Sequence, residues 1–326
     1  MKKEKTLDLS VVVPVFNEAE NLMDLYGEIT DSCHKLDRTY EIIFVDDGSM
    51  DESFNILKKI QKQDSSVRII LLRKNFGQTP AMAAGFHHAR GNIIITLDGD
   101  LQNDPGDFGL LIEKLERGYD IVSGWRKNRK DKFFTRRIPS AVANWLISRI
   151  TNVRLHDYGC TLKAFRNEVI ENIQLYGELH RFIPAIASNM GVSIAEVEVN
   201  HRPRMRGKSK YNIFRFPKVI LDLMTVKFLL TYSTRPLQIF GLFGFVSGIV
   251  GLGLGVFVSY ERLILLKGSA NRPLLWLAIL LIVVAIQFVS LGLLAEIMIR
   301  AYHESSNKRI YYVREIIESG SDSDEK

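Results

Sequence analysis

Short apolar runs alternate with amphipathic segments over the first 125 residues of the chain. The runs are rich in Val and Ile, as buried strands are, and the segments between them repeat apolar residues at helical spacing. The predicted strands are LSVVVPVF (9–16), YEIIFVDD (40–47), VRIILLR (67–73), NIIITLDGD (92–100) and YDIVSGW (119–125), and the clearest helices cover residues 18–36 and 52–63. Strands and helices in regular succession form a mostly parallel sheet with helices on both faces. The pattern therefore predicts an α/β domain.

Two later segments, from Leu237 to Tyr260 and from Leu274 to Ala295, are mostly apolar and contain no charged side chain. As helices that rise about 1.5 Å per residue, each spans roughly 33 Å, which exceeds the hydrocarbon core of about 30 Å. Buried helices of soluble proteins seldom stay free of charge for more than about 18 residues. We therefore expect two transmembrane helices rather than a buried helix hairpin.

Basic residues flank these two segments unevenly. Residues 202–235 carry nine Lys or Arg and one acid, and residues 300–314 carry four more Lys or Arg, whereas the loop 261–272 carries three. Because cytoplasmic segments carry an excess of Lys and Arg, we expect a multi-pass protein of the cytoplasmic (inner) membrane with both termini in the cytoplasm. The first apolar run, VVVPVF, is too short for a signal peptide, so the domain before the two helices is expected to be cytoplasmic.

These patterns divide the chain into four predicted parts. They are a cytoplasmic α/β domain (1–211), amphipathic juxtamembrane helices (212–235), two transmembrane helices with a short extracytoplasmic loop (236–297), and a cytoplasmic C-terminal segment (298–326). The transmembrane helices are predicted from their two segments without charged residues. The juxtamembrane segment mixes apolar residues with charged ones, as helices on a membrane surface do. The last part contains a predicted strand, RIYYVREI (309–316), and an acidic tail that is too polar to form a core.

Composition narrows the classes of function. The formal net charge is +6, and its clusters beside the apolar segments favour anionic lipid head groups over nucleic acid. Aromatic and basic residues do not interleave as they do in RNA-binding sheets. The two cysteines, Cys33 and Cys160, lie in no metal-ligand spacing, so we expect neither a disulfide framework nor a zinc site.

Acidic residues gather where two of the predicted strands end. Asp98 and Asp100 lie in LDGDLQ with Gln102 two residues further on, and Asp46 and Asp47 end another strand. Residues two apart in an extended chain point to the same side, and parallel sheets bind ligands outside the carboxyl ends of their strands. Carboxylate oxygens suit Mg²⁺ or Mn²⁺, which keep coordination positions for substrate phosphates. One pair of acids in a turn is a weak signal, because such acids also cap helices. Asp46 and Asp47 at a second strand end strengthen the prediction of a metal and diphosphate site.

The turn after the first strand, PVFNEAEN, contains no glycine, which excludes the dinucleotide fingerprint. Seven motifs instead resemble, in order and spacing, a known family: PVFNEAENL, VDDGSMDES, NFGQTPAMAAGF, ITLDGDLQNDP, IVSGWR, DYGCTLKAFR and RGKSKY. They are similar to the family-2 glycosyltransferases of the GT-A fold, and more narrowly to the polyisoprenyl-phosphate glycosyltransferases, the group of dolichol-phosphate mannose synthase and the bactoprenol glucosyltransferases. The resemblance covers residues 7–211 and implies a Rossmann-like, mixed and mostly parallel sheet with helices on both faces.

The resemblance implies a role for each matching residue. The residues implied to line the pocket for uracil and ribose are Pro14, Asn17, Glu18, Asp46 and Asp47. The residues implied to hold Mg²⁺ or Mn²⁺, and through it the donor diphosphate, are Asp98, Asp100 and Gln102, with Asp100 also counted as catalytic. The basic residues implied to surround the donor diphosphate or the lipid phosphate are Arg126, Arg202, Lys208 and Lys210. Asp157 is implied to be a catalytic residue near the reacting sugar carbon.

The implied reaction is an inverting transfer of a hexose from a UDP-sugar to a polyisoprenyl phosphate such as undecaprenyl phosphate. Glucose is the expected sugar, with other hexoses or a modified pentose left open. The second pKa of a phosphate, about 6, leaves the acceptor largely ionised at neutral pH. Such a nucleophile needs little deprotonation, so we expect Asp157 to position or stabilise a cation-like sugar rather than to act as an indispensable base.

Other functions stay open at this point. A processive polysaccharide synthase, or another family-2 enzyme with a different donor or acceptor, shares the donor motifs, although none of the three tryptophans lies in a Q-x-x-R-W motif. A nucleotidyltransferase would use the same metal clamp, and a non-enzymatic channel or lipid carrier would transfer no sugar. Glycines spaced by four, such as Gly244 with Gly248 and Gly251 with Gly255, permit close helix contact. We expect a homo-oligomer, although packing within one chain would use the same glycines.

Overall fold

The computed structural model contains two compact units, which are described separately. The first comprises Met1–Val226 with Arg309–Lys326, and the second comprises Lys227–Lys308. The described residues are 7–127, 144, 147–149, 151, 153–173, 175, 179–188, 190–203, 236–264, 272–305 and 310–318. The predicted juxtamembrane helices (212–235) and the acidic tail after residue 318 lie outside these ranges.

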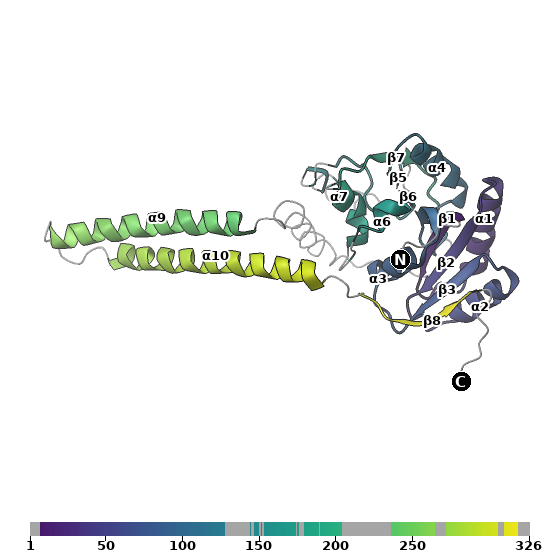
Figure 1. Ribbon diagram of the computed structural model, residues 1–326, viewed down its shortest axis with the longest axis horizontal. Coiled ribbons are helices and arrows are strands. Elements are labelled where there is room, and N and C mark those ends of the chain that lie inside the picture. Colours follow the sequence, from purple (N-terminus) through teal and green to yellow (C-terminus); the bar gives the residue numbers. More distant parts are fainter. Residues whose placement is uncertain are drawn as a thin grey trace. The chain divides into compact units, whose positions relative to one another are not determined.

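A mixed sheet of eight strands forms the centre of the first unit (Figure 1). The strands are β1 (Leu7–Val15), β2 (Tyr40–Asp46), β3 (Val67–Leu72), β4 (Gly91–Thr96), β5 (Ile121–Trp125), β6 (Lys163–Arg166), β7 (Ile194–Glu198) and β8 (Val313–Ile317). Their order is β7-β5-β6-β4-β1-β2-β3-β8. Neighbouring strands are parallel except in the pairs that include β6 or β8. The five predicted strands and the mostly parallel sheet are therefore confirmed.

Helices cover both faces of this sheet. They are α1 (Leu22–Lys35), α2 (Ser53–Gln63), α3 (Gln78–His88), α4 (Phe108–Glu116), α6 (Asn167–Ile170) and α7 (Ile183–Ser188), with the 3-10 helices η1 (Pro105–Asp107) and η3 (Leu179–Phe182). Apolar side chains of α1, α2 and α4 form the main core with alternate side chains of the strands. On the opposite face α3 approaches so closely that a Cβ at Gly85 would lie 2.2 Å from Val12 Cγ1.

β8 joins this sheet although it follows both apolar segments in the chain. The strand predicted at residues 309–316 is confirmed, and it lies beside β3 (Figure 1). It pairs antiparallel with β3, with Ile317 opposite Ile69 and Val313 opposite Leu72. The apolar pattern of the segment does not indicate which strand it joins. β8 covers a sheet edge whose backbone N–H and C=O groups would otherwise be open to pairing with other chains.

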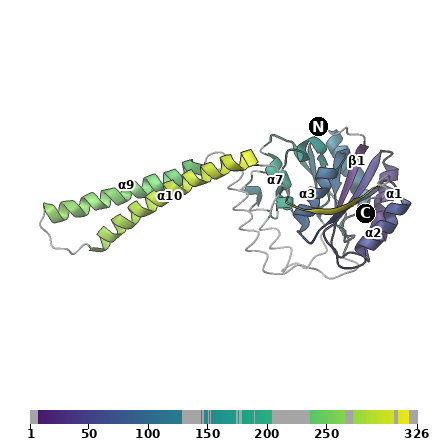
Figure 2. The same cartoon turned by 60° about the horizontal axis from the view of Figure 1, so that its bottom comes forward.

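The second unit contains a hairpin of two long helices, α9 (Pro236–Leu263) and α10 (Arg272–Ser305) (Figure 2). Each includes a segment long and apolar enough to cross a membrane, Leu237–Leu263 in α9 and Pro273–Ala295 in α10. A Cβ at Gly244, Gly251 or Gly292 would lie 2.9, 3.0 or 2.9 Å from an atom of the other helix. These three glycines therefore allow close packing of α9 against α10 within one chain. For Gly244 and Gly251, this is the alternative to contact between two chains of a homo-oligomer.

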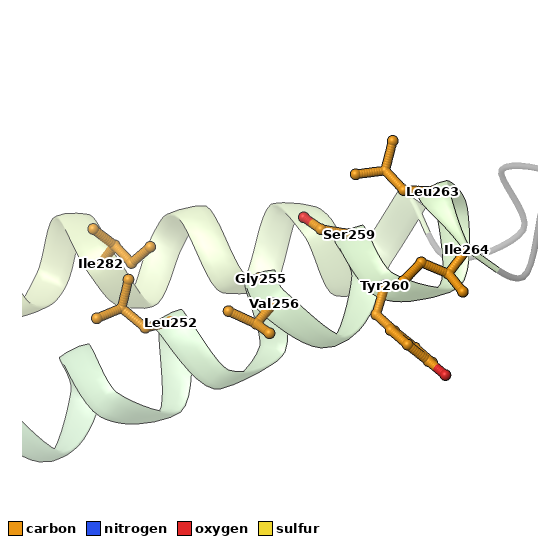
Figure 3. Close-up of a pocket in the computed structure, with 8 residues that line it drawn as sticks. All are labelled: Leu252, Gly255, Val256, Ser259, Tyr260, Leu263, Ile264 and Ile282. Atoms are coloured by element: carbon orange, nitrogen blue, oxygen red, sulfur yellow. The ribbon is translucent and has the colours of Figure 1, made fainter.

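The hairpin has a shallow hollow near the end of α9 (Figure 3). Its lining residues are mostly apolar and are Leu252, Gly255, Val256, Ser259, Tyr260, Leu263, Ile264 and Ile282. Because none of these side chains is charged, the hollow offers no metal ligand and no cation for a phosphate. The candidate chemistry lies instead in the first unit.

Candidate active site

Three parallel strands bring most of the predicted polar residues together at the carboxyl ends of the strands. β1, β2 and β4 run in the same direction, so the loops that follow them leave from the same edge. Pro14 is half-buried near the end of β1 and lies opposite Val45 of β2. Asn17 and Glu18 follow β1, and Asp98 follows β4.

The loops after β1 and β2 are joined by hydrogen bonds. The Asn17 backbone N–H donates to Ser49 Oγ at 3.0 Å, and Asn17 Oδ1 accepts from the Met50 N–H at 2.8 Å. The Glu18 backbone N–H donates to Ser53 Oγ at 3.0 Å. Asn17 has a positive φ of 52°, a conformation that Asn tolerates better than most residues. The loops that carry the predicted nucleoside-binding residues Asn17 and Glu18 are therefore held together.

Asp46 and Asp47 are both buried at the end of β2 but differ in their partners. Asp46 Oδ1 accepts from the Ser49 N–H at 2.8 Å, whereas Asp46 Oδ2 is buried with no hydrogen-bond partner among the described residues. Burial raises the pKa of Asp46. Asp47 accepts from the N–H groups of Phe76 and Gly77 at 2.7 and 2.8 Å, and burial raises its pKa to about 6, with a smaller contribution from the Asp46 charge. Asp46 thus has one unpaired acceptor among the described residues, while both Asp47 oxygens are bound by backbone N–H groups.

Asp98 and Asp100 occupy the loop directly after β4. Asp98 Oδ1 accepts from Gln78 Nε2 at 2.7 Å, and Asp100 Oδ1 accepts from the Gln102 backbone N–H at 3.2 Å. Leu101 lies between them and Gln102 with a positive φ of 59°, a strained value for an apolar residue. Burial, and then the charge of Asp100, raise the pKa of Asp98 to about 6. A divalent cation would relieve this repulsion between like charges.

The donor set at this loop fits a metal that substrate phosphates help to coordinate. Within the described ranges, no group of three or more His, Cys, Asp and Glu side chains is placed to hold a metal. Two carboxylates alone suit Mg²⁺ or Mn²⁺, which are commonly bound by one or two carboxylates together with substrate phosphates and water. The Gln102 side-chain amide donates to Arg202 O at 3.5 Å, a long contact, and leaves its own carbonyl oxygen as a possible further ligand.

Arg126 and Asp157 form a buried ion pair between the end of β5 and the turn before β6. Arg126 Nε donates to Asp157 Oδ2 at 2.7 Å and Arg126 Nη2 donates to Asp157 Oδ1 at 3.0 Å. Burial opposes the charge of Arg126, but the Asp157 hydrogen bonds and charge, with a contribution from Asp98, raise its pKa above the ordinary value. Asp157 also accepts from the Gly159 N–H at 3.1 Å. A carboxylate with these partners is suited to orienting a guanidinium rather than to removing a proton.

Lys163 is a charged residue of this region that the sequence reasoning missed. It lies in β6, is 3% exposed, and donates from Nζ to the backbone oxygens of Tyr158 and Cys160. Burial lowers the pKa of Lys163, while the charges of Cys160, Asp157 and Asp98 oppose this change. Its ammonium therefore holds the turn that follows Asp157. A lysine inside the apolar run TLKAF was the available signal.

Of the other basic residues predicted for the site, Arg202 lies beside Gln102 but is paired with acids, and two lie outside the described ranges. Arg202 Nη1 donates to both carboxylate oxygens of Glu28 at 2.7 Å, and Arg202 Nη2 lies 2.9 Å from Asp104 Oδ1. Its charge is thus shared between two acids, and the phosphate contact expected of Arg202 stays a prediction that these ion pairs do not support. Lys208 and Lys210 belong to the residues that the structure leaves undescribed.

Residues 10–174, which include all of these acidic strand ends, match the glycosyl transferase family 2 domain. The chain belongs to glycosyl transferase family 2. Among its curated relatives, the dodecaprenyl-phosphate galacturonate synthase of Rhizobium johnstonii is 42% identical over 97% of this chain and 95% of its own. The undecaprenyl-phosphate 4-deoxy-4-formamido-L-arabinose transferase of Edwardsiella ictaluri is 36% identical over 100% of this chain and 99% of its own. The similarity therefore includes the two apolar helices.

Solved structures show that this family-2 enzyme has the GT-A fold. A glucosyl-3-phosphoglycerate synthase from Mycobacterium tuberculosis, in complex with Mn²⁺, UDP and phosphoglyceric acid, has a TM-score of 0.54 at 18% identity and covers 69% of this chain and 80% of its own. A mannosyl-3-phosphoglycerate synthase from Rubrobacter xylanophilus has a TM-score of 0.54 at 15% identity and covers 68% and 74%. The predicted fold class is confirmed.

Proposed function

We propose that this glycosyltransferase moves a sugar from a UDP-sugar to a polyprenyl phosphate at the cytoplasmic face of the inner membrane. The observation that carries the proposal is the carboxylate pair Asp98 and Asp100 at the carboxyl end of β4, with Arg126 acting on Asp98. Two relatives that are similar over nearly the whole chain are named for sugar transfer to dodecaprenyl and undecaprenyl phosphate. A processive polysaccharide synthase has no comparable support.

Asp98 and Asp100 would hold Mg²⁺ or Mn²⁺, with Gln102 as a further ligand. A bound divalent cation stabilises the charge that develops on the departing nucleoside diphosphate, typically worth several kcal/mol. The likeness to a synthase in complex with Mn²⁺ and UDP supports a divalent ion, without a choice between the two metals.

Arg126 supplies a fixed positive charge in the same region. The bidentate pair with Asp157 holds the guanidinium plane, and a preorganised cation of this kind stabilises charge without rearranging during the reaction. We assign the diphosphate contact to Arg126 and the orientation of Arg126 to Asp157. Asp157 is then a positioning residue, in agreement with an acceptor phosphate that is already ionised.

The nucleoside would bind against the loops that follow β1 and β2. Asp46 Oδ2 is the buried acceptor there without a partner in the described residues, and a base N–H or a ribose hydroxyl would satisfy it. Pro14, Asn17 and Glu18 complete this binding surface, whereas Asp47 supports it through its hydrogen bonds to Phe76 and Gly77.

A single displacement by the lipid phosphate would invert the anomeric carbon, so an α-linked donor would give a β-linked product. The glucose expected from the sequence stays a prediction: the relatives named above transfer galacturonate and 4-deoxy-4-formamido-L-arabinose. α9 and α10 are each long and apolar enough to cross the bilayer, which would place the site beside its lipid substrate. Cytoplasmic termini and a homo-oligomer belong to this proposal.

The test is transfer by the purified full-length protein in vesicles that contain undecaprenyl phosphate. UDP-glucose, UDP-galacturonate and UDP-4-deoxy-4-formamido-L-arabinose are supplied separately with Mg²⁺ or Mn²⁺, and lipid products are identified by mass spectrometry. We expect one donor to give a glycosylated lipid phosphate with release of UDP. Release of pyrophosphate would indicate a nucleotidyltransferase, and a growing polymer would indicate a processive synthase; either result would contradict the proposal.

A further inference from the structure

The turn after β3 contacts both acidic strand ends. It comprises residues 73–78 and ends at the first residue of α3. The N–H groups of Phe76 and Gly77 donate to the two oxygens of Asp47 at 2.7 and 2.8 Å. The side chain of Gln78, the next residue, donates to Asp98 Oδ1 at 2.7 Å. One short segment therefore fixes carboxylates that belong to two different strand ends.

The same turn packs against the backbone that follows Asp47. Gly48 has a φ of 69°, and a Cβ at this position would lie 2.6 Å from the carbonyl carbon of Lys74 and 2.8 Å from the Asn75 nitrogen. These neighbours are backbone atoms, which cannot rotate away as a side chain does. The turn and the loop after β2 are thus one packed body, and a shift of the turn displaces its contacts with Asp47 and Asp98 together.

β8 begins where this turn begins. The Arg73 N–H donates to Tyr312 O at 3.0 Å, immediately after the last pair of the β3–β8 ladder. The rings of Phe76 and Tyr312 have centroids 6.1 Å apart at an interplanar angle of 41°. β8 therefore starts beside the carboxyl end of β3, the end of the parallel strands at which the candidate site lies.

We propose that the turn 73–78 and β8 form a brace for the donor site, in which Gln78 positions the metal-binding carboxylate of Asp98 and Tyr312 positions the turn. This inference rests on the proposed function. The Gln78 donor on Asp98 Oδ1 fixes the rotation of the carboxylate, together with a side-chain hydrogen bond between Asp98 and Thr161. Partners of this kind commonly change metal affinity by about 10–100-fold. The brace gives the segment after the second apolar helix a direct contact with the donor site.

The experiment measures Mn²⁺ binding by the full-length protein in detergent, from the electron paramagnetic resonance signal of free Mn²⁺, with and without UDP. Gln78→Leu removes the donor and is expected to weaken Mn²⁺ binding by about tenfold. Tyr312→Ala is expected to weaken it by roughly threefold, and Tyr312→Phe, which keeps the ring, to restore it. Glu315→Ala is the matched control, since Glu315 is exposed on β8 and lies opposite Leu71 of β3, and should bind as the wild type.

The outcomes separate this inference from the proposed function. A wild-type protein that binds no Mn²⁺ even with UDP contradicts the proposed function itself. Wild-type binding that Gln78→Leu leaves unchanged overturns the brace alone. Should Gln78→Leu fail to fold, the Tyr312 variants test the brace instead, because Tyr312 is exposed and its replacement should not prevent folding. Weaker binding by Tyr312→Ala than by both Tyr312→Phe and Glu315→Ala supports the brace, and equal binding by the three variants overturns it.

Discussion

Two clusters of charged side chains, each partly buried, lie at opposite ends of the strands of the same sheet, and they differ in how their charges are paired. Where the strands begin, the Glu41 carboxylate accepts from Ser10 Oγ at 2.7 Å, from the Arg90 N–H at 2.6 Å and from Arg68 Nη1 at 2.7 Å. Glu318, just after β8, lies 2.8 Å from Arg68 and 2.7 Å from Arg90. Each acid at this end faces a base.

Where the strands end, two acids of one loop repel each other, although Arg126 and Lys163 partly offset the charge of Asp98. Asp98 lies near Asp100, the pKa of Asp98 is raised to about 6, first by burial and then by that charge, and Asp46 Oδ2 has no partner among the described residues. Buried polar groups are ordinarily hydrogen-bonded, and an exception is explained by strain, a catalytic role, or a bound water or ion. The comparison therefore separates charges that pair within the fold from charges that we propose bind a substrate and its metal.

The largest expected effect is at the acidic end. Asp100→Ala removes a proposed metal ligand, so we expect sugar transfer to fall by at least about a thousandfold, roughly 4 kcal/mol of transition-state stabilisation. The measurement is the rate of lipid-product formation in vesicles with saturating metal, alongside the unfolding temperature, which should stay near that of the wild type. Transfer within tenfold of the wild type would remove the basis for the metal site.

At the opposite end the expected effect is on stability. Glu41→Ala leaves the buried Arg68 without its main partner, and breaking a buried pair commonly costs about 3–5 kcal/mol. We expect a loss near the lower value, because Glu318 still faces Arg68. Denaturant unfolding checks this, and transfer per folded molecule should change by less than about threefold. A large loss of turnover in folded Glu41→Ala would show that the two ends are coupled.

The smallest expected effect is at Arg202. This residue lies near the carboxyl ends of the strands, but it forms ion pairs with acids, as the charged residues at the opposite end do. Its half-exposed ion pairs with Glu28 and Asp104 should each contribute about 1 kcal/mol or less. Arg202→Lys keeps the charge, so we expect transfer to fall by roughly threefold at most, measured as kcat/KM for the donor. A loss of a hundredfold would mean that Arg202 leaves these acids to contact a phosphate.

Local patterns were enough to predict much of the fold. Five strands, the mostly parallel sheet, two long apolar helices and the strand near residue 313 follow from periodicity and from runs without charge, which depend on neighbours in the sequence. The placement of β8 beside β3 does not, because it depends on a contact between residues some 240 positions apart.

The acids of the site were also predictable, because their position at strand ends is a local feature. Their partners were not. Gln78 begins a helix and reaches Asp98 only through the fold, and Lys163 lies within a short strand and binds the turn before it. The pairing of Arg202 with Glu28 likewise depends on how α1 packs. Side-chain partners across the fold are set by packing, which motif spacing does not contain.

The most direct test is the unfolding temperature of Asp98→Asn. Because folding raises the pKa of Asp98, its ionised form lowers stability at high pH, and this penalty fades as the pH falls through about 6 toward the ordinary value near 4. We predict that, without metal, Asp98→Asn unfolds at a higher temperature than the wild type at pH 8, with a smaller difference near pH 4. Mn²⁺ with UDP should stabilise the wild type but not the variant. A variant no more stable than the wild type at pH 8, and equally stabilised by Mn²⁺ with UDP, would contradict a carboxylate pair kept for a metal.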